Sequence, residues 1–368
     1  FHPPPIWAHS LQLRGFTPAC FFSSGEFHPG WMLRVYSAAS GEDIVTFNSS
    51  SSNGDIVPNT VRALKGHLCQ LLGYNRFRQT ILTSDGELSE EELLTPPLEL
   101  QLVILNLWPP ELCDDTRFLL ACKENRLEDV NVMLHRPQDP DTCDDEGKSA
   151  LHISAEEGHL HCVELLLEAG AALDPIQEIT GTTPLHLAAE HGHMEVLRIL
   201  LEHKADKDKS SPHGLTPLRL AALNGHTEVV KLLLEVGADK DKASTVGATA
   251  LHLAALNGHL ETVRLLLAAG VEKDKASTAG ATPLHLAALN GHPDVARVLL
   301  EAGADRDKRT TVGGKTPLHG AALYGHVGVV RILLEFGADK EKVTTDGGAT
   351  PLALAVKNGH LEVQCMLR

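Results

Sequence analysis

The fold is decided by residues 280–303, which are Gly-Ala-Thr-Pro-Leu-His-Leu-Ala-Ala-Leu-Asn-Gly-His-Pro-Asp-Val-Ala-Arg-Val-Leu-Leu-Glu-Ala-Gly. Thr282 supplies an N-cap hydroxyl, and Pro283 suits the first helical position, where its missing N–H has no carbonyl partner. Gly291 favours the left-handed C-cap that ends a first helix, and Gly303 ends a second one. Each predicted helix is apolar on one side. Because two such helices cannot bury those sides alone, they require neighbours.

The same pattern recurs along the chain at steps of 33 or 34 residues. Thr-Pro-Leu or a close variant begins at Thr183, Thr216, Thr249, Thr282, Thr316 and Thr350, and Ser149-Ala-Leu-His lies one step earlier. A fixed period of this length indicates a solenoid in which each unit buries its apolar side on the next. With Leu-Ala-Ala, Asn-Gly-His and Gly-Ala-Asp following in order, the units resemble ankyrin repeats from about residue 112 to the end. The resemblance implies a protein-binding surface rather than a reaction.

We therefore predict a mainly α fold, a solenoid of about eight helix-turn-helix units over 114–368 that follows a small α+β domain. The predicted units are 114–144, 145–177, 178–209, 210–242, 243–275, 276–308, 309–342 and 343–368. The first unit keeps two helices but lacks Thr-Pro-Leu-His, as expected of a terminal cap. The last unit stops inside its second helix.

Residues 32–107 have a different pattern, which predicts strands around one helix. Met32–Ser37 and Asp43–Phe47 have strand character on either side of a turn, and Asn48–Gly54 is a polar loop. Val61, Leu64, Leu68, Leu71 and Leu72 follow helical spacing. The Asp85-Gly86 turn and the apolar segment 98–105 complete the region. This order resembles the ubiquitin-like β-grasp fold.

The ubiquitin-like resemblance has two implications. The last strand runs into Leu107-Trp-Pro-Pro without a diglycine, so this domain is not expected to be conjugated to substrates. The family often binds partners through an apolar patch on its sheet, and the matching positions are Leu82 and Val103, with the first loop near Ala39. The alternative is that both side chains pack within the fold or against the repeats.

The two remaining segments are short. Residues 1–31 contain Pro3-Pro4-Pro5 and aromatic residues without a period, and we expect a disordered extension or a non-native start. Residues 108–113, which include Pro109 and Pro110, form a predicted stiff linker, because proline cannot donate to a sheet.

Composition excludes several classes of function. The net charge of −16 argues against nucleic-acid binding and against a polybasic membrane anchor. No apolar run reaches the roughly 20 residues of a membrane helix. The seven cysteines are scattered without a Cys-x-x-Cys pair, which favours reduced thiols in the cytoplasm or nucleus. We expect a monomer.

No catalytic, cofactor or metal site is predicted. Gly313-Gly-Lys-Thr316 lacks the first glycine of a P-loop, since position 309 is arginine. Repeated histidines occupy two positions of the unit, His186, His252, His285 and His319 at one and His193, His226, His259, His292, His326 and His360 at the other. Packed helices lie about 8–10 Å apart, whereas zinc needs ligand nitrogens at about 2 Å. We interpret these histidines as hydrogen-bonding groups that fasten turns.

A charged segment recurs between the units. Its members are Lys207-Asp-Lys, Lys240-Asp-Lys, Lys273-Asp-Lys, Arg306-Asp-Lys and Lys340-Glu-Lys. Two interpretations remain, a basic comb for an acidic partner and, favoured here, charge that protects an exposed edge.

A second ladder follows the paired alanines, where ankyrin repeats face their concave groove and contact ligands. Its central members are Leu223-Asn224, Leu256-Asn257, Leu289-Asn290 and Leu323-Tyr324, and toward the N-terminus it becomes acidic, at Glu156-Glu157 and Glu190. Such an apolar stripe predicts a docking site for a protein segment. Recent duplication of one unit is the alternative. The hypotheses are a non-enzymatic scaffold and, second, an adaptor that recruits ubiquitin-system components.

Overall fold

The computed structural model describes residues 32–37, 43–48, 61, 63–65, 68, 79–83, 86–89, 93–94, 98–104, 115–136 and 138–368. The chain divides into two compact units, one built mainly on N-terminal strands and one that contains all the helices from residue 115 onward. The predicted extension 1–31, most of the loop 48–54 and the linker 108–113 lie outside the described residues.

The N-terminal strands form a mixed five-stranded sheet in the order β2-β1-β5-β3-β4. The strands are β1 Met32–Ser37, β2 Asp43–Asn48, β3 Gln79–Thr83, β4 Gly86–Glu87 and β5 Leu98–Ile104. β1 pairs with β2 in antiparallel fashion and with β5 in parallel. Among the described positions of the predicted helix, Val61, Leu64 and Leu68 are helical and fully buried.

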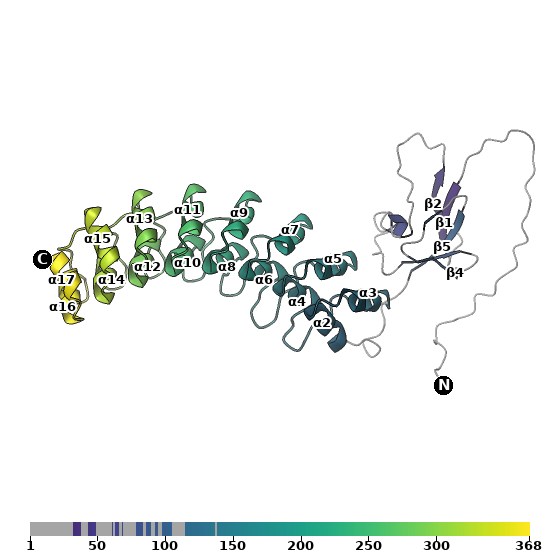
Figure 1. Cartoon of the computed structure of the whole chain (residues 1–368), viewed down its shortest axis with the longest axis horizontal. Coiled ribbons are helices and arrows are strands. Elements are labelled where there is room, and N and C mark those ends of the chain that lie inside the picture. Colours follow the sequence, from purple (N-terminus) through teal and green to yellow (C-terminus); the bar gives the residue numbers. More distant parts are fainter. Residues whose placement is uncertain are drawn as a thin grey trace, which may run out of the picture. The chain divides into compact units, whose positions relative to one another are not determined.

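From residue 115 onward, the helices form helix-turn-helix pairs that stand in a row (Figure 1). The first helices of the pairs are α2 Asp115–Lys123, α4 Ala150–Glu156, α6 Pro184–His191, α8 Pro217–Asn224, α10 Ala250–Asn257, α12 Pro283–Asn290, α14 Pro317–Tyr324 and α16 Pro351–Lys357. The second helices are α3 Leu127–His135, α5 Leu160–Glu168, α7 Met194–Glu202, α9 Thr227–Glu235, α11 Leu260–Ala268, α13 Pro293–Glu301, α15 Val327–Glu335 and α17 Leu361–Leu367. The predicted repeated helix-turn-helix packing is confirmed.

The ends of the first helices follow from the repeated residues. Thr282 is the extended N-cap of α12 and Pro283 is its first residue, as predicted. Gly291 ends the helix with φ of 75°. Its counterpart Gly258 shows why glycine is needed, since a Cβ there would lie 2.5 Å from Nδ1 of His292. The turn therefore combines a left-handed backbone with a close approach by the next unit.

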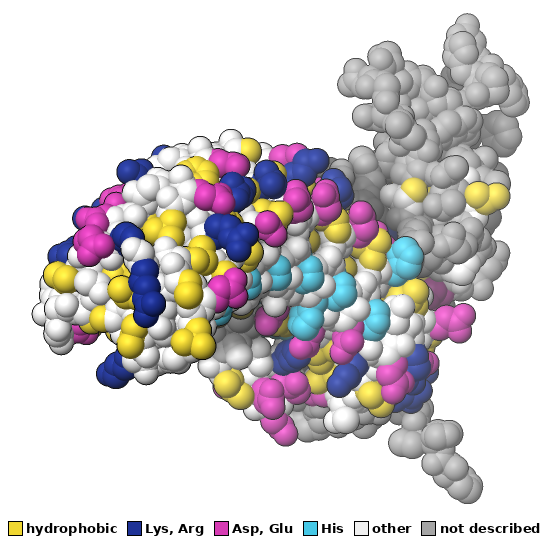
Figure 2. All heavy atoms as spheres, turned by 60° about the vertical axis from the view of Figure 1, so that its left-hand side comes forward, with side chains coloured by type: hydrophobic (Ala, Val, Ile, Leu, Met, Phe, Trp, Pro, Cys, Tyr) yellow, Lys and Arg dark blue, Asp and Glu magenta, His cyan; other side chains and the backbone are white. Residues whose placement is uncertain are grey.

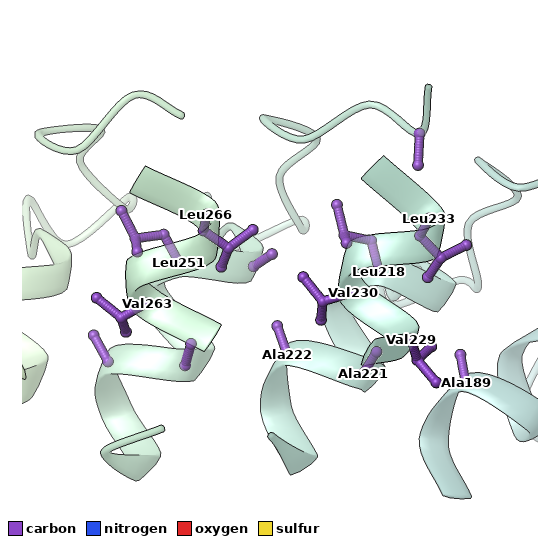
Figure 3. Packing of buried hydrophobic residues seen from close by; sticks show 14 of the residues in the cluster. Ala189, Leu218, Ala221, Ala222, Val229, Val230, Leu233, Leu251, Val263 and Leu266 are labelled. Carbon is purple, nitrogen blue, oxygen red and sulfur yellow. The ribbon is translucent and has the colours of Figure 1, made fainter. Parts of the chain in front are cut away.

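The core of the helical part is a continuous apolar layer along the row. Each first helix packs against the first helices of its neighbours and against its own second helix. Figure 3 shows this layer, where Leu218, Val230 and Leu233 of one unit repeat as Leu251, Val263 and Leu266 of the next. These six side chains are 0–2% exposed. Small residues such as Ala221 and Ala222 allow the helices to approach closely.

Candidate functional site

Five of the first helices, α4, α6, α10, α12 and α14, are anchored at their N-termini by histidines three residues after the N-cap. In α10, the Thr249 N–H donates to Nδ1 of His252 over 3.2 Å, and the Thr249 hydroxyl accepts from the backbone of His252. Nε2 of His252 then donates to the carbonyl of Ala281 in the next unit, 3.1 Å away. This is a capping box with histidine in the place of Glu or Gln. His152, His186, His285 and His319 make the same contacts.

The second set of histidines fastens the C-terminal ends of six first helices, α4, α6, α8, α10, α12 and α14. Nε2 of His259 lies 2.9 Å from the carbonyl oxygen of Leu223, and His292 and His326 reach Leu256 and Leu289 at the same distance. His193, His226 and His360 bind Glu156, Glu190 and Leu323 in the same way. Histidine side chains form a row across the face seen in Figure 2. The interpretation of both histidine sets as fastening groups is confirmed.

These bonds also fix the residues of the predicted binding site. We call the surface made by Glu156, Glu190, Leu223, Leu256, Leu289 and Leu323, together with the residue after each, the ladder face. The backbone carbonyls of these two glutamates and four leucines each accept a hydrogen bond from a histidine of the next unit. The backbone that carries each side chain is therefore held rigidly, which suits a surface that binds without rearranging.

The apolar part of the ladder face remains accessible. Leu223, Leu256 and Leu323 are half-buried, and Leu289 is 38% exposed. Tyr324 is 56% exposed, and its ring stacks on His326 with centroids 6.2 Å apart. The leucines are thus not sealed inside the stack. They form an apolar row on which another molecule can displace water.

The asparagines of the ladder face use their amide nitrogens within the array. Nδ2 of Asn224 donates to the carbonyls of Glu190 and Leu220, and Nδ2 of Asn257 donates to Leu223. Asn290 donates to Leu286 over 2.9 Å. All three side chains are exposed, and within the described part of the chain their Oδ1 atoms accept no hydrogen bond. These oxygens are available to an N–H donor.

The acidic part of the ladder face is only partly neutralised. Glu156 forms an ion pair with Lys148 of its own unit. Glu157 is exposed and Glu190 is half-buried, and neither forms an ion pair with any residue that the structure describes. Two carboxylates therefore remain free to attract a cationic group at this end.

Comparison with known proteins gives the family. A family model described as ankyrin repeats (3 copies) matches residues 118–211, 173–244, 218–310 and 303–368. The chain belongs to the ankyrin-repeat family. A search of curated proteins found no match. Ankyrin repeats are generally protein-protein interaction modules, and the family is typically non-enzymatic, which agrees with a rigid face that presents apolar side chains and acceptors.

The charged segments between the ankyrin units make contacts that sequence reasoning missed. Oδ1 of Asp241 accepts the backbone N–H of Glu272 in the next unit at 2.9 Å, and Nζ of Lys240 donates to the carbonyl of Ala269 at 2.6 Å. Equivalent aspartate bonds recur along the array, from Asp208 to Asp239, from Asp274 to Asp305 and from Asp307 to Asp339. These side chains join neighbouring units, a role that neither interpretation of the charged segments from the sequence included.

The predicted patch on the N-terminal sheet is only partly described. Leu82 lies in β3, pairs with Glu87 of β4 and is half-buried. Val103 lies in β5, but its side chain is outside the described residues, as is the loop near Ala39. The structure therefore leaves this patch as a prediction.

Other reactive groups of the ankyrin array are not arranged as a site. Burial raises the pKa of the Cys122 thiol to about 12 and that of Cys162 to about 11, which makes both thiols inert at neutral pH. Within the residues the structure describes, no group of three or more His, Cys, Asp or Glu side chains is placed to hold a metal ion. None of the described helices is long and apolar enough to cross a membrane.

Proposed function

We propose that this chain is a non-enzymatic scaffold whose ladder face binds a segment of a partner protein. The observation that carries the proposal is the row of accessible leucines, of which Leu289 is 38% exposed, beside the exposed ring of Tyr324. Apolar side chains on a preformed surface gain free energy when a partner covers them, at about 25 cal/mol for each Å² removed from water. The row of exposed asparagine acceptors adds positions at which a partner's polar groups are satisfied.

The test replaces two central leucines by charged residues. Leu256→Glu with Leu289→Glu places two carboxylates in the apolar row. In affinity capture, proteins that bind the immobilised wild-type chain should no longer bind this variant. The matched control is Val236→Glu with Val246→Glu, which changes two exposed valines, 41% and 58% accessible, elsewhere in the array. The melting curves of both variants should stay close to that of the wild type. Equal retention by wild type and the ladder-face variant would refute the site.

A second candidate is supported by the N-terminal sheet. We propose that it is a ubiquitin-like β-grasp domain that recruits ubiquitin receptors or the proteasome while the repeats hold a client. The support is the order β2-β1-β5-β3-β4 with β1 parallel to β5, because a β-grasp sheet places its first and last strands side by side. Titration of the full chain with purified ubiquitin receptors should shift the NMR signals of Leu82 and Val103. Signals unchanged at saturating receptor would remove this candidate. We propose a cytoplasmic or nuclear location for either function.

A further inference from the structure

One residue interrupts an otherwise apolar row on the first helices. The position three residues before each ladder leucine is Ile153 in α4, leucine in most later units, and Gly320 in α14. Its leucine members are Leu187, Leu220, Leu253, Leu286 and Leu354. Gly320 is inside a helix and does not have the positive φ of the turn glycines. No backbone conformation therefore requires glycine here.

The missing side chain uncovers the leucine of the preceding unit. A Cβ built on Gly320 would lie 3.7 Å from Cδ1 of Leu289, in ordinary van der Waals contact. A side chain at residue 320 would thus cover Leu289, as the periodicity of the array places Leu286 over Leu256. Leu289, at 38% exposed, is correspondingly the most exposed of the four ladder leucines. Tyr324, four residues after Gly320 and on the same side of α14, borders the gap.

We infer that this gap is the anchor point of the partner segment, which inserts one large apolar side chain against Leu289 and Tyr324. The inference rests on the proposed function and specifies the partner's chemistry. At the other end of the ladder face, Glu157 and Glu190 form no ion pair with described residues, so the segment carries lysine or arginine there. The apolar row ends at the exposed Lys357, which occupies the ladder position of the last unit. Basic residues and apolar anchor therefore lie at opposite ends of the segment.

The acceptors between these ends select an extended partner. The Oδ1 atoms of Asn224, Asn257 and Asn290 are free within the described chain, and each lies one unit from the next. A helix uses its backbone N–H groups internally, whereas an extended segment has N–H groups left to donate. We therefore assign the occupant as an extended protein segment whose backbone donates to this asparagine row.

The spacing within the partner follows from the packing of the first helices. α6, which carries Glu190, packs on α8, and the row continues through α10 and α12 to α14, which carries Gly320. Four such steps of about 8–10 Å span roughly 32–40 Å. An extended chain covers about 3.3 Å per residue, so about 10–12 residues separate the basic group from the apolar anchor.

The experiment selects peptides from a random 20-residue phage-displayed library on the full chain. Wild type is expected to enrich peptides in which lysine or arginine precedes or follows a Phe, Leu or Met by about 10–12 residues. Gly320→Leu restores the side chain found in neighbouring units, so it should lose at least tenfold in affinity for the selected peptides while its melting temperature rises. Glu157→Gln with Glu190→Gln should weaken binding severalfold and remove most of its salt dependence. Gly320→Ala, which fills less of the gap, should lose less than Gly320→Leu.

The outcomes separate the anchor point at Gly320 from the ladder face as a whole. Selected peptides that bind Gly320→Leu as tightly as wild type, but not Leu256→Glu with Leu289→Glu, would overturn the anchor and leave the proposed function standing. Failure to enrich any peptide over the double-glutamate variant would overturn both. Self-association of the chain, or binding to phosphatidylcholine vesicles, that is abolished by Gly320→Leu would assign the gap to another occupant and overturn the extended-segment proposal.

Discussion

Acid should destabilise the ankyrin array through its capping histidines, and one substitution isolates the effect. His252 is fully buried, and burial lowers its pKa from 6.5 to about 4. Its Nδ1 accepts the N–H of Thr249, so a proton on Nδ1 would remove this bond as well as place a charge in the core. Burial also lowers the pKa of His152, His186, His285 and His319.

Proton linkage determines whether acid raises or lowers the stability of the array. Because the pKa of His252 is lower in the folded chain, the unfolded chain binds more protons between about pH 6.5 and pH 4. The stabilisation is complete above pH 6.5 and is lost as the pH falls. At pH 5.5, the difference between a pKa of 6.5 and one of about 4 corresponds to about 1.4 kcal/mol from His252 alone. The other four histidines act in the same direction.

His252→Gln removes the titration and keeps the cap, because glutamine at the third helical position completes the same box with threonine. The free energy of unfolding in urea, measured at pH 7.5 and pH 5.5, should fall by about 1.4 kcal/mol less in this variant than in the wild type. His213→Gln, which changes an exposed histidine of the same array, controls for the loss of a histidine as such. An equal loss of stability on acidification in wild type and His252→Gln would refute the reasoning.

Three further substitutions test the repeated contacts. Arg219 replaces the capping histidine in α8 and is only 3% exposed. Its Nε is buried and has no hydrogen-bond partner among the described residues. Arg219→His should therefore raise the free energy of unfolding, measured by urea denaturation, by about 1–3 kcal/mol. Gly258→Ala must adopt a left-handed conformation, which costs about 1–2 kcal/mol, and in addition displaces His292. Gly359→Ala has the same φ of 75° with no atom within 4 Å of the new Cβ, so it should lose less stability; equal losses in the two glycine variants would contradict the close-contact argument.

The repeat period alone predicts much of the fold. Thr282, Pro283 and Gly291 start and end α12 where the sequence predicts, because capping depends on residues close together in the chain. The interpretation of the histidines as hydrogen-bonding groups was also correct. The carbonyl that each histidine binds lies 29 to 37 residues away in the sequence. Its identity therefore required the structure.

The ladder face stays a prediction, although the structure shows that its leucines are accessible. The ladder leucines stood out because they follow the paired alanines, where the resemblance to ankyrin repeats places the concave groove. Two features were missed, the aspartate bonds between units and the gap at Gly320. The signal for the second was present, because residue 320 departs from the leucine of its neighbours. Its meaning depends on the contact with Leu289, which only the packing of α14 on α12 reveals.

The two histidine sets also bear on how such a chain changes length over generations. A unit that carries both histidines donates one imidazole N–H to a carbonyl of the next unit and another to a carbonyl of the preceding unit, as in the bonds of His252 to Ala281 and of His292 to Leu256. Duplicating such a unit, or deleting one that lies between two others of the same kind, therefore leaves each of these histidines with a carbonyl to bind. A gene duplication or deletion of one whole unit thus preserves the hydrogen bonds at the new junction, whereas an insertion or deletion of any other length does not.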